Sequence, residues 1–70
     1  MRLSVNGQAR DCEVANLAEL WRNETADLEV SEARGFAISL NGAVVRRAAW
    51  PTTAVQDGDA VEIIRAMSGG

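Results

Sequence analysis

The sequence predicts an α+β domain in which one main helix packs on one face of a mixed sheet of four to five strands. Three observations support this prediction. Apolar and polar residues alternate in several short runs, two Asn-Gly dipeptides each separate a pair of such runs, and one segment between the pairs has its apolar residues at helical spacing. A chain of 70 residues forms one domain with a small core.

The N-terminal residues predict a hairpin. Leu3 and Val5 alternate with polar neighbours, and the Asn6-Gly7 pair that follows is typical of a tight turn between antiparallel strands. The second strand is expected over about Ala9–Val14. Because side chains alternate along a strand, its parity places Cys12 inward, where a lone thiol acts as a small buried hydrophobe.

A helix is expected to begin after Asn16. The apolar residues Leu17, Leu20 and Trp21 lie at helical spacing, and Asn16 is a good N-cap with Glu19 three residues later, as in a capping box. A helix of two to three turns is marginal alone in water, so its apolar stripe needs a sheet face to cover.

A second hairpin follows an ambiguous connector over Thr25–Gly35. The run 36–40 alternates apolar and polar residues, Asn41-Gly42 supplies another tight turn, and residues 43–47 return as the partner strand. The Trp50-Pro51 pair is expected to end this regular stretch, because proline donates no backbone hydrogen bond and disfavours helical geometry before it.

The last strand is expected over about Ala60–Ala66, after a turn at "QDGD". Its alternation puts Val61 and Ile63 on one face and Ile64 and Ala66 on the other. The predicted order is thus hairpin, helix, hairpin, irregular connection and last strand, which is the order of a β-grasp domain. We expect residues 1–66 to form this domain and residues 67–70 to be a flexible C-terminal tail.

The composition argues against several functions. The chain has no histidine, lysine or tyrosine and a single cysteine, so we expect no metal site, no disulfide and no enzymatic activity of its own. A net charge of −3 without a basic cluster argues against nucleic acid and anionic membranes as partners. The N-terminus lacks the apolar segment of a secretory signal, so we expect a cytoplasmic location.

Three further pairs of side chains each admit a structural and a functional interpretation: Asp57 and Asp59, Arg46 and Arg47, and Trp21 and Trp50. We expect the aspartates to be part of a solvated turn, with contact to a basic partner as the alternative. The arginines are expected to be solvated at the end of the fourth strand, or else to bind a partner's carboxylate. The tryptophans are expected to be core and edge-covering aromatics rather than ligand platforms.

The terminal "MSGG" is not explained by packing, because glycine has no side chain to bury. A carboxylate on such an arm becomes electrophilic if a partner enzyme converts it to an acyl-adenylate, and a sulfur donor can then leave a thiocarboxylate. Glycines suit this chemistry because the backbone can thread a narrow channel whose walls exclude water from the activated group.

The segments "ISLNGAVVRRAAW", "QDGDAVEII" and "SGG" together resemble ThiS, the ubiquitin-like β-grasp family of sulfur-carrier proteins in thiazole biosynthesis, over nearly the whole chain. The resemblance implies that Gly70 carries the adenylate and then the thiocarboxylate, and that Gly69 and Ser68 lie in a partner's channel. Arg47 would match the arginine after the second hairpin, where the family commonly has Pro-Arg and this chain has Arg46-Arg47.

The resemblance also implies three partners in thiamine biosynthesis. They are a ThiF-like adenylating enzyme that uses ATP and magnesium, a persulfide donor fed by cysteine desulfuration, and a ThiG-like thiazole synthase that accepts the sulfur. ATP would bind the activating enzyme, so we expect no cofactor on this chain. The expected docking surface is the outward side of the last strand, Ile64, Ala66 and Met67, together with Arg47.

Other functions fit the same residues. A MoaD-like carrier would deliver sulfur to molybdopterin, and a related carrier would serve cysteine synthesis, although MoaD-like chains usually have a longer connector before the third strand. A β-grasp interaction module would use the glycines as a passive end. A modifier conjugated to lysines, as ubiquitin is, would share the activation step.

Overall fold

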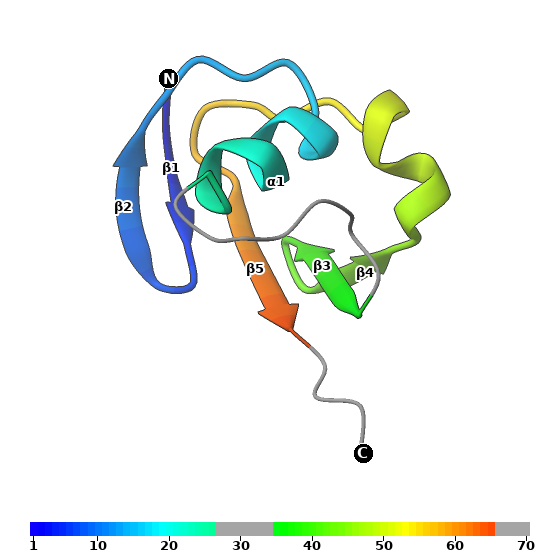
Figure 1. The fold of residues 1–70 in the computed structure, drawn as a ribbon. Helices are drawn as coiled ribbons and strands as arrows, with labels where there is room; N and C mark the ends of the chain where they lie inside the picture. Colours follow the sequence, from blue (N-terminus) through cyan, green and yellow to red (C-terminus); the bar gives the residue numbers. More distant parts are fainter. Residues whose placement is uncertain (27–34, 66–70) are drawn as a thin grey trace.

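The computed structural model describes residues 1–26 and 35–65 (Figure 1). The regular elements, in chain order, are β1 (Arg2–Val5), β2 (Gln8–Asp11), α1 (Leu17–Glu24), β3 (Phe36–Leu40), β4 (Ala43–Val45), the 3₁₀-helix η1 (Arg47–Thr52) and β5 (Ala60–Arg65).

The strands form one five-stranded sheet in the order β2-β1-β5-β3-β4. β5 pairs parallel with β1 and antiparallel with β3, while the two hairpins β1–β2 and β3–β4 are antiparallel. α1 lies across one face of this sheet, as Figure 1 shows. The predicted α+β architecture, a mixed sheet with one main helix on one face, is therefore confirmed.

Both Asn-Gly turns are confirmed. Asn6 and Gly7 have φ values of 53° and 80°, and Asn41 and Gly42 have φ values of 51° and 88°. Positive φ at both central residues is what type I′ hairpin turns require, and asparagine and glycine tolerate it best. The two turns bring β1 beside β2 and β3 beside β4.

The second strand is shorter than predicted. β2 ends at Asp11 and not at Val14, because its partner β1 begins at Arg2 and the register Arg2↔Asp11 is the last rung of the ladder. Cys12 then donates its backbone N–H to the Met1 carbonyl at 3.0 Å and leaves the sheet. Its side chain packs against the core, as an inward position predicts, but it is half-buried and not fully buried.

α1 begins as the sequence predicts. The Asn16 Oδ1 accepts the Glu19 backbone N–H at 2.9 Å, and the Glu19 carboxylate accepts the Ala15 backbone N–H at 3.1 Å, which is a capping box displaced by one residue. At the other end the Thr25 hydroxyl donates to the Trp21 carbonyl at 2.7 Å. Both ends of this short helix are therefore capped by side chains.

The core lies between α1 and the sheet. Its buried apolar side chains come from β1, α1, β3, η1, β5 and the loops beside them: Leu3, Val5, Val14, Leu17, Leu20, Trp21, Ile38, Trp50, Val55 and Val61. The two tryptophan rings have centroids 6.2 Å apart, and the Phe36 ring meets Trp21 edge-on at 5.4 Å. The prediction that the tryptophans are structural aromatics is confirmed.

The segment after the second hairpin differs from the prediction. β4 ends at Val45, so Arg46 and Arg47 do not lie in the fourth strand, and η1 runs through Trp50-Pro51, where irregular chain was expected. Burial of the Trp50 side chain holds this turn against the core. The fixed φ of Pro51 is compatible with a 3₁₀ turn, so proline does not interrupt it.

The two tryptophans should respond differently to replacement by phenylalanine. Trp50 Nε1 donates to the Val45 carbonyl at 2.9 Å, whereas Trp21 Nε1 is buried without a partner among the described residues. Because Trp50→Phe breaks a hydrogen bond and Trp21→Phe breaks none within the described residues, Trp50→Phe should lower the free energy of unfolding by about 1 kcal/mol more, as urea denaturation would measure. Equal losses would show that the Trp50 hydrogen bond contributes nothing net.

Candidate functional site

The residues predicted to act in sulfur transfer divide into two groups. One group lies outside the described residues: Ala66, Met67, Ser68, Gly69 and Gly70. The other group comprises Ile64 and Arg47, which are both exposed. The structure therefore describes the part of the domain from which the C-terminal residues extend, and the surface beside it.

β5 exposes Ile64 on the face of the sheet that α1 does not cover, which we call the outer face. Ile64 lies opposite Ala37, and Glu62 lies opposite Ser39, which itself lies opposite Val44. Since residues directly opposite each other in a sheet share a face, all five side chains lie on the outer face. The large hydrophobic residues exposed within the described residues are Val44 and Ile64, with exposed fractions of 78% and 55%.

Val44 was missed by sequence reasoning, although the alternation of β4 could have found it, since half-buried Val45 is its neighbour and must point the other way. Arg47 begins η1, beyond edge strand β4, while Ile64 lies in β5, and β3 separates the two strands. The outer face thus joins Ile64 to Val44 through β3, whereas Arg47 belongs to η1, which packs against α1.

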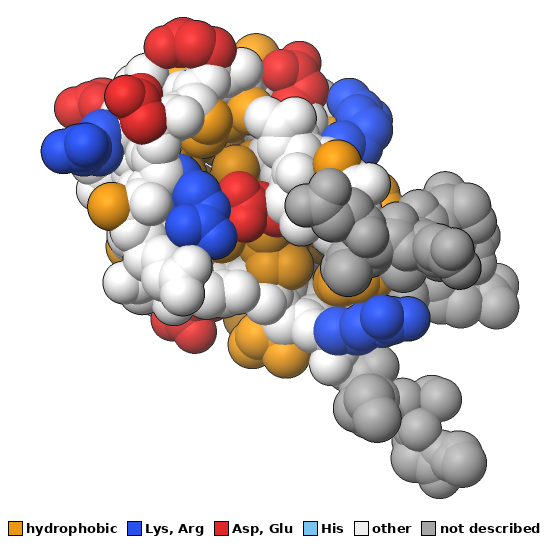
Figure 2. Space-filling view, turned by 60° about the vertical axis from the view of Figure 1, so that its left-hand side comes forward, with side chains coloured by type: hydrophobic (Ala, Val, Ile, Leu, Met, Phe, Trp, Pro, Cys, Tyr) orange, Lys and Arg blue, Asp and Glu red, His pale blue; other side chains and the backbone are white. Residues whose placement is uncertain are grey.

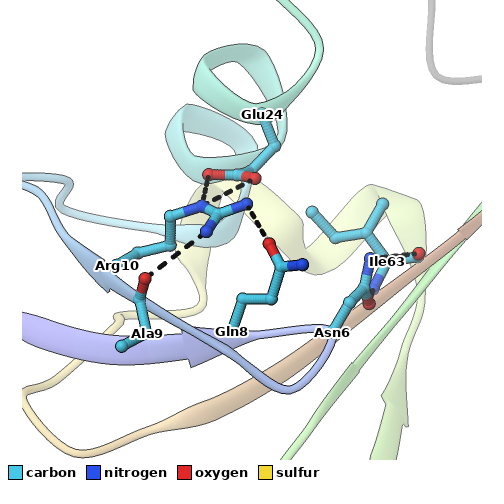
Figure 3. A network of polar contacts seen from close by, with 6 residues as sticks. All are labelled: Asn6, Gln8, Ala9, Arg10, Glu24 and Ile63. Atoms are coloured by element: carbon cyan, nitrogen blue, oxygen red, sulfur yellow. Dashed lines mark hydrogen bonds and ion pairs between the residues drawn. The ribbon is translucent and has the colours of Figure 1, made fainter.

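Charged side chains of both signs lie beside one another on the molecule, as Figure 2 shows for one face. The Arg10 Nε lies 3.3 Å from both carboxylate oxygens of Glu24, and one terminal nitrogen donates to the Gln8 side chain at 3.1 Å (Figure 3). This contact joins β2 to the C-terminal end of α1. Sequence reasoning did not find it, because it pairs residues of different elements.

The end of β5 is held by contacts on both edges. On one edge, Phe36 of β3 lies opposite Arg65, whose guanidinium carbon lies 5.6 Å from the centre of the Phe36 ring, which is cation–π geometry. On the other edge, the Asn6 side chain bonds to both backbone groups of Ile63 (Figure 3). β5 is therefore supported up to Arg65 on the edge beside β3 and up to Ile63 on the other edge.

The start of β5 is held by the second Asn-Gly turn and by the "QDGD" turn. The Asn41 Oδ1 accepts the Ala60 N–H at 2.9 Å, and its Nδ2 donates to the Asp59 carboxylate at 3.1 Å. The Asp57 carboxylate accepts the Arg2 N–H at 2.6 Å, and that of Asp59 accepts the Gln56 N–H at 2.8 Å. Both aspartates therefore stabilise backbone at the turn.

Two of the hollows lined by described residues border β5. The larger, of about 490 Å³, is open and lies on the outer face beside Ser4 and Glu62. The smaller, of about 190 Å³, lies at the end of α1 beside Glu24 and Thr25. Two polar side chains of the smaller hollow are already engaged, since Glu24 pairs with Arg10 and the Thr25 hydroxyl is bonded to backbone.

Residues 1–26 and 35–65 contain neither a metal-binding cluster nor a membrane-spanning helix. No group of three histidine, cysteine, aspartate or glutamate side chains there could hold a metal ion. Nor does any helix in this part of the chain have the length and apolar character needed to cross a membrane.

Comparison with known proteins gives a consistent result. The model of the ThiS family matches residues 3–70. A crystal structure of the thiamine biosynthesis protein ThiS from Geobacter metallireducens is 40% identical, covers 100% of both chains and superposes with a TM-score of 0.74. A solution structure of a thiamine biosynthesis protein from the same organism is also 40% identical, covers 100% of this chain and 88% of the other, and has a TM-score of 0.70. No curated protein matches. The chain therefore belongs to the ThiS family.

Proposed function

We propose that this chain is a sulfur carrier whose Gly70 carboxylate is adenylated and converted to a thiocarboxylate, which delivers sulfur for thiazole formation in thiamine biosynthesis. The observation that carries the proposal is the family match over residues 3–70, which includes the two terminal glycines. The full-length similarity to a thiamine biosynthesis protein supports the same pathway over molybdopterin or cysteine synthesis.

The proposed chemistry has three balanced steps. A Gly70 carboxylate oxygen attacks the α-phosphorus of ATP and the bond to the β-phosphate breaks, so pyrophosphate leaves and an acyl-adenylate remains. The terminal sulfur of a persulfide attacks the acyl carbon and AMP leaves, which gives an acyl disulfide. A thiol then attacks the donor's sulfur, which releases the thiocarboxylate and joins donor and thiol as a disulfide.

In this proposal two parts of the chain have different roles. Residues 1–66 form the β-grasp body that partners recognise, and residues 67–70 form the tail that enters their active sites. Gly69 and Ser68 occupy the entrance channel, where a side chain on Gly69 would meet walls built to exclude water from the adenylate. The chain is then the substrate of its partners and supplies no cofactor.

The partners follow from these steps. A ThiF-like enzyme supplies MgATP, a persulfide protein supplies the sulfur, and a ThiG-like synthase accepts it. Docking uses the outer face around Ile64, continued by Ala66 and Met67, together with the exposed Arg47. The apolar exposure of Ile64 and Val44 on the same face supports this surface, since exposed apolar side chains on one face are available for protein–protein contact.

The experiment that tests the proposal is ATP–pyrophosphate exchange with a ThiF-like enzyme from the same genome. Intact chain should stimulate exchange of labelled pyrophosphate into ATP, because forming the acyl-adenylate is reversible. Chain blocked at Gly70 as the C-terminal amide should not stimulate it, since an amide offers no carboxylate oxygen. Equal exchange with the amide would show that Gly70 is not the activated group.

Replacement of Ile64 should weaken docking without unfolding the domain. Ile64→Ser removes a side chain that is 55% exposed, so the thermal midpoint should change little, while KM for the activating enzyme should rise about tenfold, the usual effect of losing one well-placed apolar contact. Arg22→Ser is the matched control, because Arg22 is exposed on α1, which covers the other face. A KM unchanged in Ile64→Ser would remove Ile64 from the docking surface.

A further inference from the structure

β5 extends beyond the end of β1, the strand that pairs with it on one edge. β1 pairs with it only through Ser4↔Ala60 and Val5↔Val61, because β1 ends at Val5 and the chain then turns away through Asn6 and Gly7. Four further residues of β5 follow Val61, and on this edge no strand within residues 1–26 and 35–65 lies beside them. The other edge of β5 pairs with β3 up to Arg65.

The side chain of Asn6 supplies the missing rung. Its Oδ1 accepts the Ile63 N–H at 2.8 Å, and its Nδ2 donates to the Ile63 carbonyl at 3.2 Å (Figure 3). A carboxamide has the same donor and acceptor as a peptide group, so it continues the ladder where the backbone of β1 stops. The backbone N–H of Asn6 donates to the Val61 carbonyl at 2.9 Å, which places the side chain one rung further along β5.

We propose that Asn6 is a positioning residue for the C-terminus: by bonding both backbone groups of Ile63, it sets the direction in which β5 carries residues 66–70 into a partner's active site. The inference rests on the proposed function. It follows from the position of Ile63, which lies three residues before Ala66, so a change in the path of β5 there is carried to every residue beyond it. Misplacement of a reacting group by about 1 Å costs on the order of a hundredfold in rate.

The chain offers a matched control in Asn41. Asn41 is also the first residue of an Asn-Gly turn, with φ of 51° against 53° for Asn6, and its carboxamide also makes two hydrogen bonds at β5. Those bonds, however, hold Ala60 and Asp59 at the start of the strand. Loss of either carboxamide removes two exposed hydrogen bonds, but only the loss at Asn6 removes support from the end of β5 nearest Gly70, which then keeps its pairing with β3 alone.

The test compares Asn6→Gly with Asn41→Gly, because glycine keeps the positive φ of each turn and removes only the carboxamide. Activation of Gly70 by a ThiF-like enzyme and MgATP is measured as a function of chain concentration, below the thermal midpoint of both variants. Asn6→Gly should lower kcat on the order of tenfold and leave KM within about twofold of the wild-type value. The docking face is intact in this variant, and only the direction of residues 66–70 has changed. Asn41→Gly should leave both parameters within about twofold.

Asn6→Asp is a second variant. Its carboxylate keeps an acceptor for the Ile63 N–H but sets a negative oxygen against the Ile63 carbonyl, so it should lower kcat as Asn6→Gly does. The Ile63 amide should also exchange with solvent faster in both Asn6 variants than in Asn41→Gly.

The outcomes separate this inference from the proposed function. A wild-type kcat in Asn6→Gly, or equal losses of kcat in Asn6→Gly and Asn41→Gly, would overturn the positioning role while leaving the carrier function in place. Absence of Gly70 activation in the wild-type chain would overturn both.

Discussion

Removal of Gly70 should abolish thiocarboxylate formation and leave the thermal midpoint almost unchanged. The shortened chain still ends in a glycine carboxylate, but this group lies about 3.5 Å short of its former position. Reacting atoms need to lie within about 3–3.5 Å of each other, so a loss of at least a hundredfold in loading is expected. Val61 is the last buried core residue among the described residues, so removal of Gly70 should lower the free energy of unfolding very little. Thermal unfolding and intact-mass spectrometry measure the two effects.

An added residue after Gly70 provides the control. It places the carboxylate beyond its former position by one residue and turns the Gly70 carboxylate into an amide, so loading should again be abolished. Gly69→Ala should slow loading more than it changes folding, because it only adds a methyl group in the channel. A large fall in the thermal midpoint of the shortened chain would show that the C-terminus packs on the domain and is not a free tail.

Replacement of Leu20 by alanine should cost about 3 kcal/mol, within the 2–5 kcal/mol typical of such core truncations. Leu20 has an exposed fraction of 0% and lies between α1 and the sheet. A domain of this size has a free energy of unfolding of only about 5 kcal/mol, so the substitution would remove most of it. Urea denaturation followed by circular dichroism measures the loss, and sulfur loading at 37 °C should fall with the folded fraction.

The matched control for Leu20→Ala is Val44→Ala. Val44 is 78% exposed on the outer face, so its truncation should change the free energy of unfolding by no more than about 0.5 kcal/mol. If Leu20→Ala proved as mild as Val44→Ala, the helix would not cover the sheet as the structure has it.

Structural features that depend only on residues close together in the sequence could be predicted from it. The turns at Asn6-Gly7 and Asn41-Gly42 depend on two residues that tolerate positive φ, and the start of α1 depends on Asn16 and Glu19, which bond to backbone three or four residues away. The exposure of Ile64 followed from alternation along one strand. In each case the physical cause lies within the segment itself.

Features that depend on residues far apart in the sequence could not be predicted. β2 ends at Asp11 because Asp11 pairs with Arg2, the first residue of β1. The 3₁₀-helix η1 continues through Pro51 because Trp50 is buried in a core formed by other segments. The carboxamide of Asn6 completes the ladder of β5 across 57 positions of sequence, and no local pattern marks such a contact. The sequence therefore marks the terminal residues of the proposed site, but it does not mark the side chain that we propose positions them.

Intact-mass spectrometry tests the carrier function most directly. The chain is incubated with a ThiF-like enzyme, MgATP, a persulfide donor and a thiol, and its mass is compared before and after. We expect a gain equal to the replacement of one oxygen atom by sulfur, located at Gly70 by fragmentation and absent without ATP. An unchanged mass with an active, matched enzyme, or a gain located anywhere other than Gly70, would contradict the proposed function.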